Sequence, residues 1–133
     1  MNGALITSLV LSTATVFIHT IGGDREARMI QPSEEADVKQ KAIWTMLRGV
    51  FHWVTLDLLL IAVLQWVVMV SDVITAEKEV LFWLGLYCCA AALFWVISIL
   101  ISPRINKRFL VLGQWILMLV TGGILLIAAD AHL

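Results

Sequence analysis

The sequence predicts an all-α integral membrane protein, a four-helix bundle that forms a single transmembrane domain over residues 1–133. Hydrophobic residues make up 61% of the 133 residues, and charged residues make up only 14%. A soluble domain of this size cannot bury so large an apolar fraction in one core. The formal net charge of −1 also lacks the basic excess that binding to nucleic acid requires. The composition therefore excludes a soluble monomer and indicates that the chain lies in a lipid bilayer. We expect no nucleic acid as a partner.

Four apolar stretches are long enough to cross a bilayer as helices, since a span needs about 20 predominantly apolar residues. They cover about residues 3–22, 42–70, 80–102 and 109–129. We expect the first span to be retained, because the positive segment that begins a signal peptide is missing before it. In the polar loop 23–41, Ser33 is expected to cap a helix that starts at Glu34 and continues into the second span. That helix would be about 57 Å long, so it should project from the membrane, tilt or bend.

The basic residues predict the orientation of the spans. Eight of the nine lysines and arginines lie in or beside the first and third loops, which share one face of the membrane. These are Arg25, Arg28, Lys39, Lys41, Arg48, Arg104, Lys107 and Arg108. Loops that carry most of the basic residues stay in the cytoplasm. We therefore expect a multi-pass protein of the cytoplasmic (inner) membrane with both termini outside.

Polar side chains on the first span recur at a helical spacing. Ser8, Ser12, Thr15 and His19 follow one another at intervals of four, three and four, which places them on one helix face. One interpretation is helix packing, in which the hydroxyls bond to carbonyls of the preceding turn or to a neighbouring helix. The other is the lining of a hydrated or ligand-binding path.

The second span carries Arg48, His52 and Thr55 on one face, with Asp57 deeper on a different side. Along the expected spans, His19 and Gln114 lie at about the depth of Arg48 and His52. His19, Arg48, His52 and Gln114 could therefore meet in one cluster near the cytoplasmic side. Asp57 would lie nearer the bilayer middle, at the level of the hydroxyls of the first span. The main candidates for a ligand site or a proton path are therefore His19, Arg48, His52, Asp57 and Gln114. The hydroxyl residues of a supporting polar face are Ser8, Ser12, Thr15 and Thr55.

Two histidines on different helices at one depth are the minimum for ligation of haem b, and Arg48 could then pair with a propionate. A proton path through His52 and Asp57 is a second possibility, because histidine titrates near neutral pH. In a third, His19 and His52 satisfy only each other, Arg48 or backbone groups. Two histidines are too few for a zinc site, which takes three or four protein ligands. We expect no metal and no cofactor, with haem b as the alternative.

Two motifs resemble a family of small four-helix bacterial inner-membrane proteins of unassigned function. One is His19-Thr20-Ile21-Gly22-Gly23-Asp24 at the end of the first span, and the other is Phe51-His52-Trp53-Val54-Thr55 early in the second. They are similar to the patterns H-x-x-G-G-[DE] and [WF]-H-x-V-T of that family. The resemblance covers about the first 60 residues and draws attention to His19, Gly22, Gly23 and His52. It implies a relative but no activity.

The function that we expect is that of a non-enzymatic accessory or binding subunit, or of a transporter for protons or a small solute. So small a bundle cannot enclose a wide path alone, so we expect a homo-oligomer or a larger membrane complex. The alternative is an electron-transfer protein that binds haem b or a quinone through His19 and His52. The sequence leaves open whether the protein is an enzyme. The buried polar cluster is the only feature that would favour one, and it would then act on a lipid or another membrane-soluble substrate.

Overall fold

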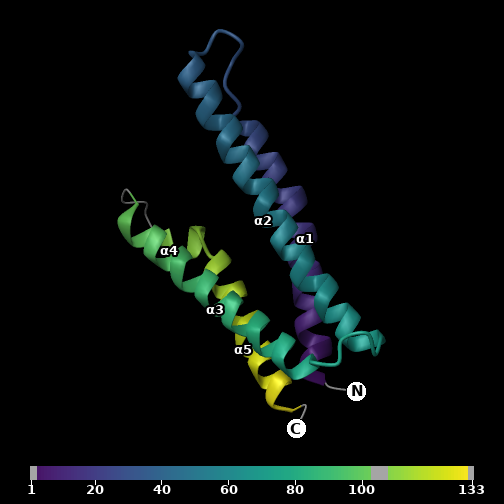
Figure 1. Cartoon of the computed structure of the whole chain (residues 1–133). Coiled ribbons are helices and arrows are strands. Elements are labelled where there is room, and N and C mark those ends of the chain that lie inside the picture. Colours follow the sequence, from purple (N-terminus) through teal and green to yellow (C-terminus); the bar gives the residue numbers. More distant parts are fainter. Residues whose placement is uncertain (1–2, 103–107, 132–133) are drawn as a thin grey trace. The chain divides into compact units, whose positions relative to one another are not determined.

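The computed structural model describes residues 3–102 and 108–131. Over these ranges the chain is all-α, as predicted, with helical segments and no strand (Figure 1). The segments are α1 (Gly3–Met29), α2 (Val38–Val70), α3 (Glu77–Ile101), α4 (Arg108–Val111) and α5 (Gln114–Asp130). Three of them, α1, α2 and α3, are long and apolar enough to cross a membrane, and α5 is a shorter apolar helix.

The described helices pack as two compact units. One unit is Val10–Leu64, in which most of α1 and most of α2 lie side by side as a hairpin. The other unit combines Met1–Leu9 with Gln65–Leu133 and contains α3, α4 and α5. The single transmembrane domain expected from the sequence stays a prediction.

The first loop is shorter than the polar segment 23–41, because both helices that flank it continue beyond the apolar stretches. α1 ends at Met29, seven residues past the expected end of the first span, and α2 begins at Val38. The added turn of α1 is held by an ion pair of 2.7 Å between Arg28 and Asp24, at the i,i+4 spacing that stabilises helices. Hydropathy indicates where a helix enters lipid, and α1 continues beyond its apolar stretch.

The helix start expected at Ser33 and Glu34 is wrong. The carbonyl oxygen of Ser33 accepts a bond from the amide of Ala36 in a turn, and α2 begins only at Val38. Asp37 caps α2, since its carboxylate Oδ1 accepts the backbone N–H of Gln40 at 2.8 Å. An aspartate that bonds the amide three residues on satisfies one of the free donors of the first helical turn.

In the second unit, α3 and α5 approach each other through two glycines. A Cβ on Gly85 would lie 3.1 Å from the carbonyl oxygen of Gly122, and a Cβ on Gly122 would lie 2.7 Å from Sγ of Cys89. Gly85 and Gly122 are both buried. Small residues allow helix backbones in membranes to come close enough for dense packing, and these two glycines hold the contact between α3 and α5.

The fourth expected span, 109–129, is interrupted. α4 ends at Val111 and α5 begins at Gln114, with Gly113 before its first turn. The amide of Ile116 bonds to the carbonyl of Gly113, so the carbonyl of Leu112 takes no part in that turn. It accepts the indole N–H of Trp95 on α3 at 3.2 Å instead. A carbonyl released at a helix break in an apolar setting needs such a donor, which explains how α3 supports the interruption.

Candidate functional site

Two of the polar residues predicted from the sequence, His19 and Arg48, lie along the contact between α1 and α2. Within the Val10–Leu64 unit, side chains of the two helices meet at positions spaced three or four residues apart, as in packed helix pairs. We call these positions the hairpin seam. They are His19, Gly23, Asp24 and Ala27 on α1 and Trp44, Arg48 and Phe51 on α2, and all are half-buried.

His19 is held against α2 by two contacts. Its ring stacks on the ring of Phe51, with centroids 4.4 Å apart and planes 21° apart. Its Nε2 lies 3.4 Å from the carbonyl oxygen of Phe51, to which it can donate as the Nε2–H tautomer. The space for Phe51 comes from Gly23, because a Cβ there would lie 3.1 Å or less from three atoms of the Phe51 ring. His19, Gly23 and Phe51 thus form one packed group that joins the two helices.

One helical turn closer to the loop, charged and aromatic groups join the same helices. The carboxylate of Asp24 pairs with Arg28 of its own helix at 2.7 Å and with Nη2 of Arg48 at 3.0 Å. The guanidinium of Arg48 lies 5.3 Å from the centre of the Trp44 ring, within the range of a cation–π contact. Trp44 in turn donates its indole N–H to the carbonyl of Ala27 at 3.0 Å. The loop end of the hairpin is therefore fastened by an ion pair, a hydrogen bond and an aromatic contact.

The hydroxyls of the predicted polar face bond within their helices or are buried. Thr15 donates to the carbonyl of Leu11 at 2.7 Å, and Thr55 donates to that of Phe51 at 3.1 Å. Ser8 is 0% exposed and Ser12 is 4% exposed. Hydroxyls that bond the carbonyl four residues back are those of the packing interpretation. The bonds of Thr15 and Thr55 are of that kind, whereas the buried Oγ of Ser8 has no hydrogen-bond partner among the described residues. Both the packing and the path that these residues could line stay predictions.

The remaining candidates are not part of the seam. His52 is exposed on α2, and its ring meets the edge of the Phe51 ring at 5.5 Å between centroids. Asp57 is half-buried. It lies about 7.5 Å farther from the loop along α2 than His52, at about 1.5 Å per residue. Gln114 is exposed at the first position of α5, in the other unit. The cluster of His19, Arg48, His52 and Gln114 therefore stays a prediction as a whole, although two of its members lie on the seam.

The arrangement of the histidines bears on haem and metal binding. Bis-histidine ligation needs both imidazoles to present a ring nitrogen to one iron. Here Nε2 of His19 is directed at a backbone carbonyl on the seam, while His52 follows Phe51 by one residue and is exposed. Among the described residues no group of three or more His, Cys, Asp or Glu side chains is placed to hold a metal ion. The seam residues thus act as contacts between helices, and the haem hypothesis stays a prediction.

Three residues of the loop end were not among the sequence-predicted candidates. They are Asp24, which pairs with Arg48, together with Phe51 and Trp44. Asp24 is the first charged residue after the uncharged part of α1. On α2, Arg48 is the first charged residue that follows Asp57 in the direction of the loop. Matching the depth of charges of opposite sign would have found this pair. Gln65, which is 0% exposed, was also missed, because it lies in an otherwise apolar run.

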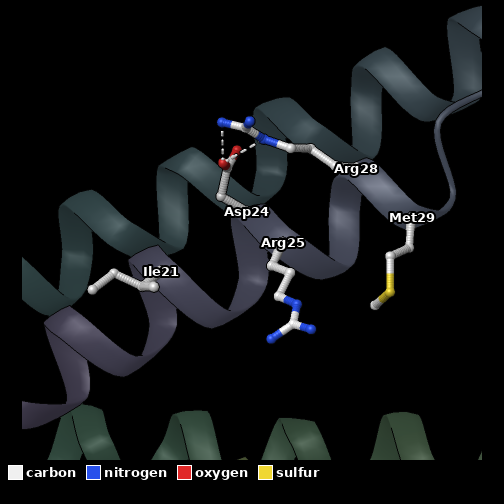
Figure 2. A pocket seen from close by; sticks show the side chains of 5 residues that line it. All are labelled: Ile21, Asp24, Arg25, Arg28 and Met29. Atoms are coloured by element: carbon white, nitrogen blue, oxygen red, sulfur yellow. Dashed lines mark hydrogen bonds and ion pairs between the residues drawn. The ribbon is translucent and has the colours of Figure 1, made fainter.

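Beside α1 lies a shallow, open depression of about 390 Å³, lined by Ile21, Asp24, Arg25, Arg28 and Met29. Figure 2 shows Arg25 and Met29 directed to one side of α1, while Arg28 turns back to Asp24. A second depression, of about 300 Å³, lies at the loop end of the hairpin. We call it the tip depression. It is lined by Ile30, Pro32, Gln40, Ile43, Trp44 and Leu47.

Comparison with known proteins gives no relative for this chain. No family model matches it, no curated protein is significantly similar to it in sequence, and no solved structure matches its fold. The resemblance of its two histidine motifs to small inner-membrane proteins therefore stays a prediction.

Proposed function

We propose that the protein is a non-enzymatic binding subunit of the cytoplasmic membrane that self-associates through the loop end of its α1–α2 hairpin. In this proposal the loop end lies in the cytoplasm and both termini lie outside, as the distribution of basic residues favours. The observation that carries the proposal is the tip depression, an apolar surface at the end of the hairpin that lies beyond the uncharged part of α1.

The length of α2 places this surface outside the hydrocarbon core. α2 has 33 residues and is therefore about 50 Å long, against a core of roughly 30 Å. If its end at Val70 lies at one interface, about 13 residues from Val38 onward extend past the other. This part of α2 exposes Ile43, Met46 and Leu47. Large apolar side chains that are gathered outside lipid are typical of protein–protein contacts.

The hairpin presents this surface on a firm support. Trp44, which lines the depression, is fixed by its hydrogen bond to Ala27 and by the guanidinium of Arg48 above its ring. A prepared surface loses less conformational entropy when it binds than a mobile one does. The contacts of the seam therefore serve binding, since they hold the tip in place.

The charges of the loop end favour a second copy of this chain as the partner. Residues 24–48 contain five acidic and five basic side chains, so their formal net charge is zero. Two such tips do not repel each other as like-charged surfaces would. A symmetric pair would bring the apolar depression of one copy against that of the other, which is how most homo-oligomers associate.

Site-specific photo-crosslinking in intact membranes tests the proposal. p-Benzoylphenylalanine at Leu47, which is 55% exposed, is expected to give an adduct of twice the 14.8 kDa chain mass. Two differently tagged copies of the chain would identify both members of the adduct. The same probe at Leu93, an exposed residue in the middle of α3, is the matched control and should give no such adduct.

The variant Leu47→Glu gives a second readout. Burying a leucine contributes about 1.5–3 kcal/mol, so the variant should weaken dimerisation at least about tenfold, as measured by light scattering in mild detergent. A tip probe that reacts only with lipid or with another protein would overturn the proposal. So would a Leu47→Glu variant that dimerises as well as the original chain.

A further inference from the structure

We propose that the depression on α1 binds the phosphate of an anionic phospholipid, with Arg25 as its main ligand. The depression is the one lined by Ile21, Asp24, Arg25, Arg28 and Met29 (Figure 2). This site is separate from the tip depression, and the inference does not depend on self-association.

The position of Arg25 along α1 corresponds to the headgroup region. The helix is uncharged from Gly3 to Gly23, and its first charged residues are Asp24 and Arg25. A helix of about 20 residues crosses a core of roughly 30 Å, so Arg25 lies about 5 Å beyond the apolar stretch that ends at Gly22. Long basic side chains at this level extend their charged ends to the lipid phosphates.

The charges around the depression leave a positive excess. Asp24 carries one negative charge and pairs with two guanidinium groups, those of Arg28 and Arg48. Arg25 adds a third positive charge, and among the described residues it has no hydrogen bond or ion pair. The three charged side chains that line the depression, Asp24, Arg25 and Arg28, therefore sum to a formal charge of +1. Glu26, the nearest further acid in the sequence, does not line the depression.

The guanidinium groups are also free to bind in the way that phosphate requires. Arg28 uses Nε and Nη2 for Asp24, which leaves Nη1 for another acceptor. Arg25 has all its donors available and points away from the Asp24 pair (Figure 2). Arginine binds phosphate oxygens through two parallel N–H donors, which a point charge such as lysine cannot do.

The apolar lining of the depression distinguishes a phospholipid from free phosphate. Ile21 lies one turn before Arg25, toward the membrane, and Met29 lies one turn after it. Ile21 is 70% exposed, so it offers an apolar surface beside the guanidinium on the side where the acyl chains of a lipid begin. A molecule that carries both a phosphate and acyl chains fits both parts of this surface.

Native mass spectrometry of the full chain in mild detergent tests the inference. The probes are a short-chain phosphatidylglycerol, the matching phosphatidylcholine, and glycerol phosphate, which carries the phosphate without acyl chains. We expect phosphatidylglycerol to bind the protein more tightly than either other probe. Each juxtamembrane arginine adds about 1 kcal/mol to binding of anionic lipid, which is about fivefold in affinity, so Arg25→Gln should weaken phosphatidylglycerol binding about fivefold.

Lys39→Gln is the matched control, because it removes one positive charge from an exposed residue of α2 outside the depression. It should leave the affinity for phosphatidylglycerol unchanged, and circular dichroism of both variants should report an unchanged helix content. Equal losses in the two variants would overturn the inference, since attraction would then depend on overall charge alone. Equal binding of phosphatidylcholine would also overturn it, and equal binding of glycerol phosphate would show a site for free phosphate instead.

Discussion

Replacing Gly23 by alanine is expected to destabilise the α1–α2 hairpin, whereas the same change at the adjacent Gly22 is not. A Cβ at Gly23 would lie 3.1 Å or less from Cε2, Cζ and Cδ2 of Phe51. A Cβ at Gly22 would meet nothing within 4 Å. The two glycines are neighbours on one helix, so each substitution serves as the control for the other.

The size of the effect follows from three contributions to the free energy of unfolding. Both substitutions gain about 0.8–1 kcal/mol, because alanine favours the helix over glycine. At Gly23 the added methyl group enters filled space, which costs about 1–3 kcal/mol. The ring of Phe51 must also leave its stack on His19, a contact worth about 0.5–1.5 kcal/mol. The net loss for Gly23→Ala is roughly 0.5–3.5 kcal/mol, against a gain of up to about 1 kcal/mol for Gly22→Ala.

The assay is unfolding of the purified protein by sodium dodecyl sulfate in mixed micelles, followed by circular dichroism. Gly23→Ala should unfold at a lower mole fraction of dodecyl sulfate than the original chain, and Gly22→Ala at an equal or higher one. Adding Phe51→Leu to Gly23→Ala should recover part of the loss, because the smaller side chain leaves room for the methyl group. Equal unfolding midpoints for the two alanine variants would refute the packing of Phe51 on Gly23.

The remaining predictions concern the other helix contacts and the histidines. Gly122→Ala should lower the free energy of unfolding by about 2 kcal/mol. Its Cβ would lie 2.8 Å from the backbone carbonyl oxygen of Gly85, which places the cost at the upper end of about 1–3 kcal/mol, and the helix propensity of alanine returns about 1 kcal/mol; an unchanged midpoint in the same titration would contradict this contact. A double-mutant cycle of Asp24→Asn and Arg48→Gln should give a coupling of about 0.5–1 kcal/mol, since both side chains are partly exposed, at 27% and 32%; zero coupling would show that the pair does not hold the hairpin. The dithionite-reduced minus oxidised absorption spectrum of protein from haem-supplied cells should be flat, because Nε2 of His19 already faces a carbonyl of α2; a split α band that disappears in His19→Ala would instead identify a cytochrome.

The sequence was sufficient to predict where the helices lie, but not where they end. Runs of apolar residues identify segments that partition into lipid, and α1, α2 and α3 follow these runs. Helix ends depend on local bonds that hydropathy does not record. The Asp24–Arg28 pair continues α1 beyond its apolar run, and Asp37 rather than Ser33 caps α2. The interruption before α5 was missed because it depends on a contact between helices. The interruption frees the carbonyl of Leu112, and the indole N–H of Trp95 donates a hydrogen bond to that carbonyl.

The candidate site was predictable in depth but not in its contacts. Matching positions along the helices predicted a cluster that contains His19 and Arg48, and both residues lie on the hairpin seam. It could not give the partners, since these depend on which helix faces meet and at what rotation. His19 stacks on Phe51, and Arg48 pairs with Asp24. Phe51 entered only as the first position of the motif Phe51-His52-Trp53-Val54-Thr55, which does not indicate its contact with His19, because an aromatic residue in an apolar helix is equally compatible with contact to lipid.

The contacts of the seam limit where a function can reside on the hairpin. A polar group in lipid is stabilised mainly by a partner, and once it has one it is no longer available to a ligand without a loss of stability. His19, Asp24 and Arg48 have such partners across or along the helices. Arg25 and Leu47 differ, because both are exposed and, among the described residues, neither side chain forms a hydrogen bond, ion pair or ring contact between α1 and α2. Variants of Arg25 and Leu47 therefore separate binding from folding, which variants of the seam residues cannot do.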